Sequence, residues 1–187
     1  MSMHDVARSI AAAFCLAVAS TCFAAESPNF GQPATPDQIA SWDISIPPDG
    51  SGLPDGSGTA KQGEVVFAAK CASCHGEKGA GSPNEPPSPV SAGPLAGGQG
   101  TLAGDRAPVQ TVGSYWPYAT TLFDYIRRAM PWAAPKSLTD QEAYSLTAYI
   151  LQLNGIIGAD DVVDARSLPA VQMPNRDNFI RVYPNEP

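Results

Sequence analysis

Two cysteines and a histidine carry the most specific chemical signal in this chain: Cys71, Cys74 and His75 form the pattern C-x-x-C-H. Two thiols at this spacing can reach the two vinyl groups of one porphyrin and form thioether bonds. The imidazole of the next residue then lies under the ring, where a neutral nitrogen can bind iron. In an exported protein the pattern predicts one covalently bound haem c, with His75 as an iron ligand.

Two other kinds of site share the C-x-x-C spacing, a redox dithiol and half of a zinc site. A thioredoxin-like dithiol needs a βαβ setting, which the sequence does not indicate. A structural zinc site normally has four ligands, and the chain after residue 25 offers no second Cys or His pair. Both alternatives therefore explain the sequence less well than haem attachment.

Residues 1–25 have the pattern of a secretory signal peptide. Arg8 precedes an apolar, Ala-rich run over residues 10–23, and small residues at Ala24 and Ala25 offer a cleavage site. The pattern predicts a periplasmic protein, which fits the attachment of c-type haem outside the bacterial inner membrane. An uncleaved leader would act as a membrane anchor, although the run is short for a span.

The second iron ligand must come from a small set of side chains. After residue 25 the chain has one His, His75, and two Met, Met130 and Met173. Haem with two His ligands is therefore excluded within one protomer, which leaves Met, water or a less usual side chain. A thioether favours ferrous iron and suits electron transfer. Met130 lies at a helix end between two predicted helices and is favoured over Met173, which lies in the tail.

Three helices are predicted to position these residues, over residues 59–71, 117–129 and 139–154. Thr59 is the expected N-cap of the first, and Thr139 with Glu142 forms a capping box for the third. Their apolar residues recur at helical spacing. A shorter helix is predicted to begin at Thr35, with Pro36 in its first turn.

One glycine inside the first helix needs a reason, because Gly destabilises a helix by about 1 kcal/mol relative to Ala. Close contact between Gly63 and another helix supplies one, with Tyr149 packing across Gly63 and Phe67. The alternative is that the helix begins later, near Glu64.

Residues 76–114 are predicted to be mostly loop, since their prolines forbid a long helix. Within this loop, the rigid turn at Gly93 and Pro94 can present a carbonyl to His75 and fix its ring. An ordinary turn is the alternative. The side chains that could face the haem propionates are Arg106, Tyr115, Trp116, Arg127 and Arg128; solvated arginines on a helix surface are the alternative for the last two.

The domain prediction divides the chain into the signal peptide, an irregular lead-in over 26–58, a haem domain over 59–155 and an irregular extension over 156–187. We expect the lead-in and the extension to wrap the haem domain or hold a partner. The predicted fold class is all-α. A net charge of -7 argues against nucleic-acid binding.

Several of these features together resemble a class I cytochrome c. They are the helix with Gly63 and Phe67, the haem motif, the Gly93-Pro94-Leu95 turn, the Met130-Pro131 pair and the last helix with Tyr149. The resemblance implies a class I cytochrome c fold with long extensions. It also implies His75 and Met130 as axial ligands, and the Pro94 carbonyl as the group that orients His75.

Longer stretches resemble the SoxD family, the cytochrome subunits of sulfane dehydrogenase and related sulfite dehydrogenases. The stretches are residues 31–36, 53–58, 112–131, 146–151 and 173–177. SoxD has two haem domains, and this chain, with one C-x-x-C-H, resembles the N-terminal one. The resemblance implies a partner subunit with a molybdenum cofactor that oxidises sulfur compounds and passes electrons to the haem.

The sequence thus predicts a periplasmic monohaem cytochrome that is an electron-transfer subunit rather than a catalyst by itself. Electrons would leave it for a downstream cytochrome or oxidase. Two alternatives are a general shuttle for other periplasmic dehydrogenases, and a haem enzyme whose iron keeps an open site.

Overall fold

The computed structural model describes residues 30–82, 92–105 and 107–180, and divides the chain into two units. The predicted signal peptide lies outside the described residues. The first unit ends at Asp43 and includes helix α2 (Pro36–Trp42). Thr35 caps this helix and forms a capping box with Gln38, as the Thr-Pro start predicts. Within α2 itself no residue is buried.

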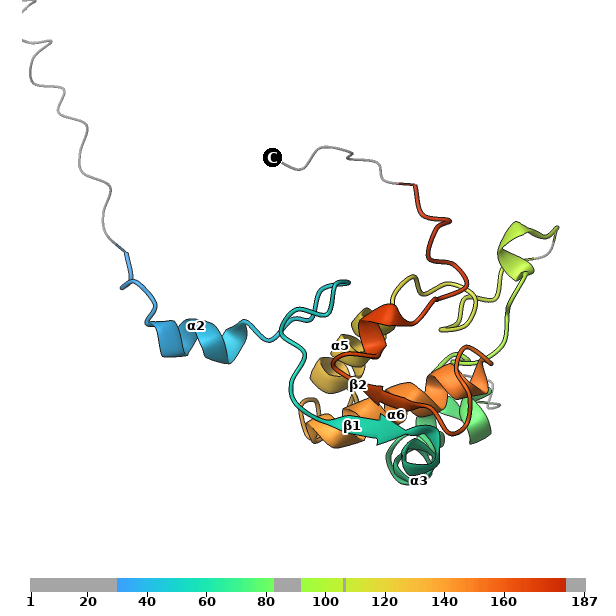
Figure 1. The fold of residues 1–187 in the computed structure, drawn as a ribbon, viewed down its shortest axis with the longest axis horizontal. Coiled ribbons are helices and arrows are strands. Elements are labelled where there is room, and N and C mark those ends of the chain that lie inside the picture. Colours follow the sequence, from blue (N-terminus) through green and yellow to red (C-terminus); the bar gives the residue numbers. More distant parts are fainter. Residues whose placement is uncertain (1–29, 83–91, 106, 181–187) are drawn as a thin grey trace, which may run out of the picture. The chain divides into compact units, whose positions relative to one another are not determined.

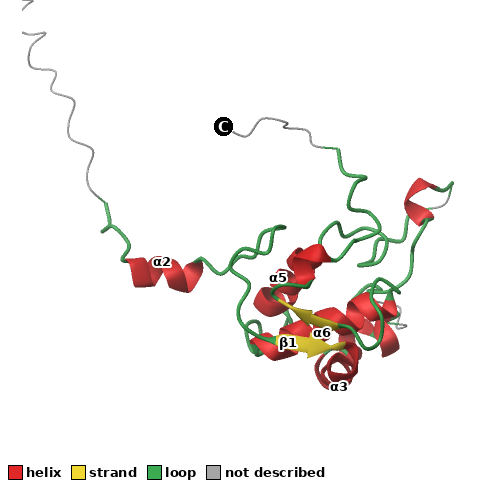
Figure 2. Cartoon of the chain, viewed as in Figure 1, coloured by secondary structure: helices red, strands yellow, loops and turns green. Residues whose placement is uncertain are grey.

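Three helices form the core of the second unit: α3 (Ala60–Lys70), α5 (Ala119–Ala129) and α6 (Asp140–Leu153). Thr59 and Thr139 cap α3 and α6 through capping boxes with Gln62 and Glu142. The fold is therefore mainly helical, as predicted, and Figure 2 shows the helices in red with short yellow strands beside them. The helix predicted over 117–129 begins two residues later, after Tyr118.

Helices α3 and α6 cross in close contact, and in Figure 1 α3 is viewed nearly end on while α6 runs across the view. A Cβ built on Gly63 would lie 1.9 Å from the Ser145 carbonyl oxygen, so only glycine allows this approach. The rings of Phe67 and Tyr149 pack beside it with centroids 5.3 Å apart. The predicted close contact at Gly63 is confirmed, and a helix start near Glu64 is wrong.

The two extensions are less irregular than expected, because a strand from each pairs with the other. Strand β1 (Ser57–Thr59) pairs antiparallel with β2 (Val162–Asp164), and Gly58 lies opposite Val163. Both strands lie along α6 in Figure 1. A Cβ at Gly58 would lie 2.2 Å from the Ser145 nitrogen, so the strand backbone rests directly on the helix.

This packing buries α6 on almost every side. Its predicted apolar face is buried at Ala143, Leu146 and Ile150, but the other face is buried too, and Tyr144 and Thr147 are 0% exposed. The Tyr144 hydroxyl donates to the Pro54 carbonyl at 2.8 Å. The extensions therefore supply the second wall of the core.

The remaining elements are short. They are α4 (Ala72–His75), the 3-10 turns η1 (Glu77–Gly79) and η2 (Thr101–Ala103), and the turn η3 (Leu168–Ala170). Between residues 76 and 114 the described residues form only these turns and loops, as predicted. Among the residues that the structure describes, no helix has both the length and the hydropathy needed to cross a membrane.

Candidate haem site

A cavity of about 520 Å³ opens between the helices, a volume within the range of about 300–1,000 Å³ that is usual for ligand and cofactor sites. Its apolar wall comes from all three core helices: Phe67 of α3, Leu122 and Ile126 of α5, and Leu146 and Ile150 of α6. An apolar hollow of this kind is suited to a flat, largely hydrophobic ligand.

The C-x-x-C-H motif forms part of this wall. Cys71 ends α3 and begins α4, and its carbonyl accepts hydrogen bonds from the Cys74 and His75 amides at 3.1 and 3.0 Å. This single tight turn brings both thiols and the imidazole to the cavity, which all three side chains line. Both cysteines are half-buried, and they do not form a disulfide with one another.

Burial raises the pKa of the Cys71 thiol to about 11, with a smaller contribution from Cys74 and an opposing one from Lys70. A redox-active C-x-x-C normally has a thiol with a lowered pKa, because the thiolate is the nucleophile. The dithiol alternative is therefore disfavoured. The zinc alternative is disfavoured as well, because no group of three metal-binding side chains occurs in the described residues.

His75 has the form that binds a metal. Burial lowers the pKa of its imidazole, so the ring is neutral at neutral pH, while the nearby Gly93 carbonyl acts in the opposite direction. Its Nδ1 is buried, yet no described residue forms a hydrogen bond of good geometry with it. A buried nitrogen of this kind needs a partner, and the Gly93-Pro94 turn lines the same cavity as His75.

Met130 reaches the same cavity from another element. It is the C-cap of α5, and its amide donates to the Ile126 carbonyl at 3.1 Å, which fixes its backbone at the end of the helix. Met130, Pro131 and Trp132 all line the cavity. A single hollow thus contains two thiols, an imidazole and a thioether, the four groups that the sequence assigns to one haem.

Comparison with known proteins assigns the family. A protein-family model described as "Cytochrome c" matches residues 60–154, the stretch that builds the cavity. The chain belongs to the cytochrome c family. Haem c, covalently bound, is the cofactor of this family, and the donors in the cavity wall fit it.

Two known proteins are similar to larger parts of this cytochrome. One is a chain in the crystal structure of the sulfane dehydrogenase SoxCD from Paracoccus pantotrophus. It is 39% identical, with a TM-score of 0.71, over 86% of this chain and 73% of that chain. The other is the thiosulfate dehydrogenase of Psychrobacter arcticus, 30% identical over 114 residues. That match covers 59% of this chain and only 32% of the thiosulfate dehydrogenase. The predicted resemblance to SoxD-like class I cytochromes is confirmed.

Met173, the second methionine among the described residues, has a different environment. Met173 is 4% exposed and belongs to the hydrophobic core, and it is not among the residues that line the cavity. This placement leaves Met130 as the thioether beside His75 in the described structure.

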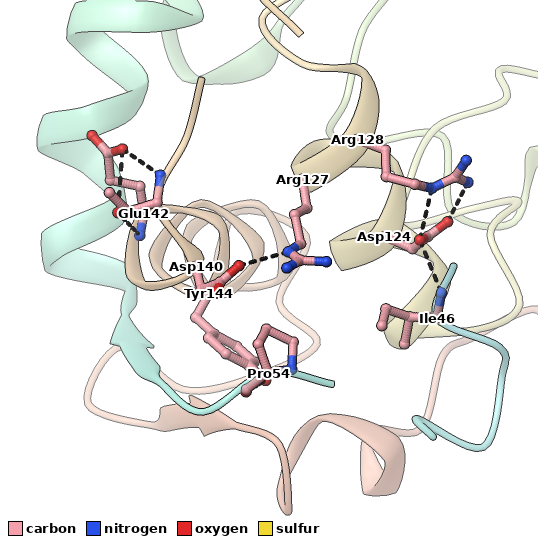
Figure 3. Close-up of polar contacts among 9 residues, drawn as sticks. Ile46, Pro54, Asp124, Arg127, Arg128, Asp140, Glu142 and Tyr144 are labelled. Atoms are coloured by element: carbon pink, nitrogen blue, oxygen red, sulfur yellow. Dashed lines mark hydrogen bonds and ion pairs between the residues drawn. The ribbon is translucent and has the colours of Figure 1, made fainter. Parts of the chain in front are cut away.

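The residues predicted for the propionate edge separate into three groups. Trp116 lines the cavity and packs edge to face on Tyr125, with ring centroids 5.8 Å apart. Arg127 pairs with Asp140 at 2.6 Å, and Arg128 pairs with Asp124 (Figure 3), so both arginines have partners within the protein. Tyr115 packs on Phe179 and is not part of the cavity wall, and Arg106 lies outside the described residues.

Asn154 supports the site from outside the cavity wall, and it was not identified as such from the sequence. Its Nδ2 donates to the carbonyls of Leu95 and Ile150, and its Oδ1 accepts from the Gly97 amide and from Gln99 Nε2. All donor and acceptor positions of the amide group are used. Asn154 thereby joins the end of α6 to the loop that follows the Gly93-Pro94 turn.

Proposed function

We propose that this cytochrome is the electron-transfer subunit of a periplasmic dehydrogenase that oxidises sulfur compounds. Its partner would be a subunit with a molybdenum cofactor, and its electrons would pass to a downstream cytochrome or oxidase. The observation that carries the proposal is the similarity to a SoxCD chain, 39% identical over 86% of this chain. The similarity to a thiosulfate dehydrogenase supports sulfur chemistry, although this chain spans only about a third of that protein.

Within this proposal each residue of the haem site has one role. Cys71 and Cys74 form the thioether bonds, and His75 and Met130 bind the iron from the cavity wall that they share. Haem c, when bound, supplies reversible one-electron redox chemistry, which the protein tunes through ligands and burial.

The Gly93-Pro94 turn would complete the His75 side. On the resemblance to class I cytochromes c we assign the Pro94 carbonyl as the acceptor for His75 Nδ1, although the Gly93 carbonyl is the one that acts on the imidazole in this structure. The turn is held at Leu95, whose amide donates to the Gly79 carbonyl at 2.8 Å and whose carbonyl accepts from Asn154. A fixed acceptor keeps the imidazole ring in one orientation toward the iron.

In this role the cytochrome accepts and passes on electrons and does not bind the sulfur substrate, so it is not a catalyst by itself. The alternative of a haem enzyme with an open iron site is disfavoured by the thioether of Met130 in the cavity wall. Carbon monoxide distinguishes the two functions, because it binds rapidly to reduced iron only where a ligand position is open.

Stopped-flow absorbance tests the function. The oxidised cytochrome is mixed with a purified molybdenum sulfane dehydrogenase subunit and its sulfur substrate, and haem reduction is followed. We expect reduction only when both are present. Failure to reduce this cytochrome, with reduction of an unrelated control cytochrome in the same mixture, would contradict the proposal.

A further inference from the structure

We infer that Asp124 is a positioning residue for the Met130 side of the haem site. Through Asp124, residues 44–54 of the lead-in support α5 from the side away from the cavity and hold Met130 at the iron. The inference rests on the Met130 ligation proposed above, and goes beyond it by naming what keeps that ligand in place.

Helix α5 has two faces with different partners. Leu122, Ile126 and Met130 follow one another at four-residue spacing and line the haem cavity. Thr120 and Asp124 lie at the spacing of the opposite face, and they are buried, at 1% and 7% exposure. This second face is covered by the lead-in.

Hydrogen bonds join the lead-in to the second face. The Ile46 amide donates to Asp124 Oδ1 at 3.0 Å, and the Thr120 hydroxyl donates to the Pro48 carbonyl at 3.1 Å. Arg128 completes the environment of the carboxylate, since its Nε donates to Asp124 Oδ1 at 2.8 Å. Figure 3 shows Asp124 between Ile46 and Arg128.

The lead-in is itself fixed, so it can serve as an anchor. Ile46 is 3% exposed in the core, and the Pro54 carbonyl accepts a hydrogen bond from Tyr144 of α6. A Cβ at Gly50 would lie 2.5 Å from the Pro169 ring, so the lead-in also contacts the C-terminal extension. Asp124 thus connects α5 to a segment held by α6 and by the extension.

Loss of this connection should change the position of Met130. Met130 directly follows the last residue of α5, so an outward shift of the helix moves its sulfur away from the cavity. A neutral thioether stays bound to iron only while the protein holds it in place. Loosening α5 therefore raises the fraction of molecules in which the Met130 position at the iron is open.

The test compares Asp124→Asn with the unchanged holoprotein. Asn keeps the size of the side chain, but its neutral oxygen accepts the Ile46 amide more weakly than a carboxylate does, and it cannot neutralise Arg128. We expect carbon monoxide to bind the reduced variant on the order of tenfold faster, the change expected when a charge-assisted hydrogen bond becomes a neutral one. The absorbance band of the bond between methionine sulfur and ferric iron should weaken, and the reduction potential should fall.

The matched control is Asp140→Asn. It removes the ion pair of Arg127, the neighbouring arginine of the same helix, whereas the hydrogen bonds described between α5 and the lead-in are those of Thr120 and Asp124. Carbon monoxide should bind this variant at the wild-type rate. That result would show that the effect of Asp124 comes from its contact with the lead-in and not from the loss of any ion pair on α5.

Two further variants test the positioning role of Asp124 and the ligation by Met130 separately. Thr120→Val removes the other bond to the lead-in and leaves the Arg128 pair intact, so it should speed carbon monoxide binding less than Asp124→Asn does. It replaces Asp124→Asn if that variant does not fold. Met130→Ala reports the open site directly.

Wild-type binding in the Asp124 and Thr120 variants, with fast binding in Met130→Ala, would overturn the positioning role of Asp124 and leave the ligation standing. Wild-type binding in Met130→Ala would instead overturn the ligation.

Discussion

Gly63 of α3 and Ser145 of α6 meet backbone to backbone, and a Cβ on Gly63 would lie 1.9 Å from the Ser145 carbonyl oxygen. The same Cβ would lie 2.7 Å from Tyr149 Cβ. The obstacle is helix backbone rather than a flexible side chain. The two helices that form one wall of the haem cavity can therefore cross only at a glycine.

Gly63→Ala should force α3 and α6 apart and destabilise the holoprotein by about 4 kcal/mol or more. Chemical denaturation followed by circular dichroism measures this change. Gly104→Ala is the matched control, because a Cβ at Gly104 has only Thr101 O within 4 Å, at 3.8 Å. Equal stability of the two variants would show that the crossing tolerates a methyl group.

Asn154→Ala should destabilise the protein by about 3 kcal/mol, because it leaves several buried polar groups without partners. Amide hydrogen exchange should accelerate at Gly97, whose N–H donates to Asn154 Oδ1. Gln152→Ala, in the same last turn of α6, serves as the control with little expected change. Unchanged protection of Gly97 in Asn154→Ala would refute the link between α6 and this loop.

Glu142 should make part of the stability depend on acid pH. A hydrogen bond from Lys70, at 2.6 Å, is the largest cause that lowers the pKa of its carboxyl group, followed by the Thr139 amide. A lowered folded-state pKa means that the stabilisation is present above the unfolded value of about 4.3 and is lost as pH falls through the folded value.

Glu142→Gln isolates this charge, because Gln can keep the capping box, as Gln62 does in α3. At pH 7 the variant should lose up to about 1 kcal/mol, a typical value for a partly exposed ion pair. The difference from wild type should shrink as pH falls below 4. Glu64→Gln removes the same charge from an exposed position of α3. A Glu142 difference that does not change with pH would contradict the ion pair.

Met130→Ala and Met173→Ala should affect different properties, the first the haem iron and the second the stability of the core. Met130→Ala should lower the reduction potential and open the iron to carbon monoxide, with little loss of stability. Met173→Ala should cost about 2–4 kcal/mol of stability, because it leaves a cavity in the core, while the haem spectrum stays unchanged. Absorbance spectra of both variants report the iron ligation, and denaturation curves report their stability. If Met173→Ala instead opened the iron and Met130→Ala instead lowered only the stability, Met173 would be the ligand.

The helices could be predicted because their signals are local. Thr59 and Thr139 each form a capping box with a residue three positions later, which the sequence shows directly. The start of α5 was misplaced because its N-cap, Tyr118, makes no side-chain cap and remains extended after Pro117. No strong local signal marks that boundary.

The pairing of β1 with β2 could not be predicted. Each strand has three residues, too few to show the alternation of apolar and polar residues that predicts a strand, and more than half the chain lies between them. For the same reason the full burial of α6 was missed, because the wall over Tyr144 comes from segments that look irregular in the sequence.

Some residues of the haem site have local sequence signals, and others depend on partners far away in the sequence. Cys71, Cys74 and His75 follow from one short motif, and Met130 from elimination and its place after a helix. Asn154 and Asp124 could not be found, because their partners at Leu95 and Ile46 lie far away in the sequence. Only the fold shows which loop each side chain meets.

The central claim is that one haem is bound covalently through Cys71 and Cys74, and intact-mass spectrometry of the denatured protein tests it most directly. The protein is purified from a host able to mature c-type cytochromes. We predict the mass of the polypeptide plus one haem, and loss of that added mass when both cysteines are replaced by serine. A denatured wild-type protein with the mass of the polypeptide alone would contradict the account.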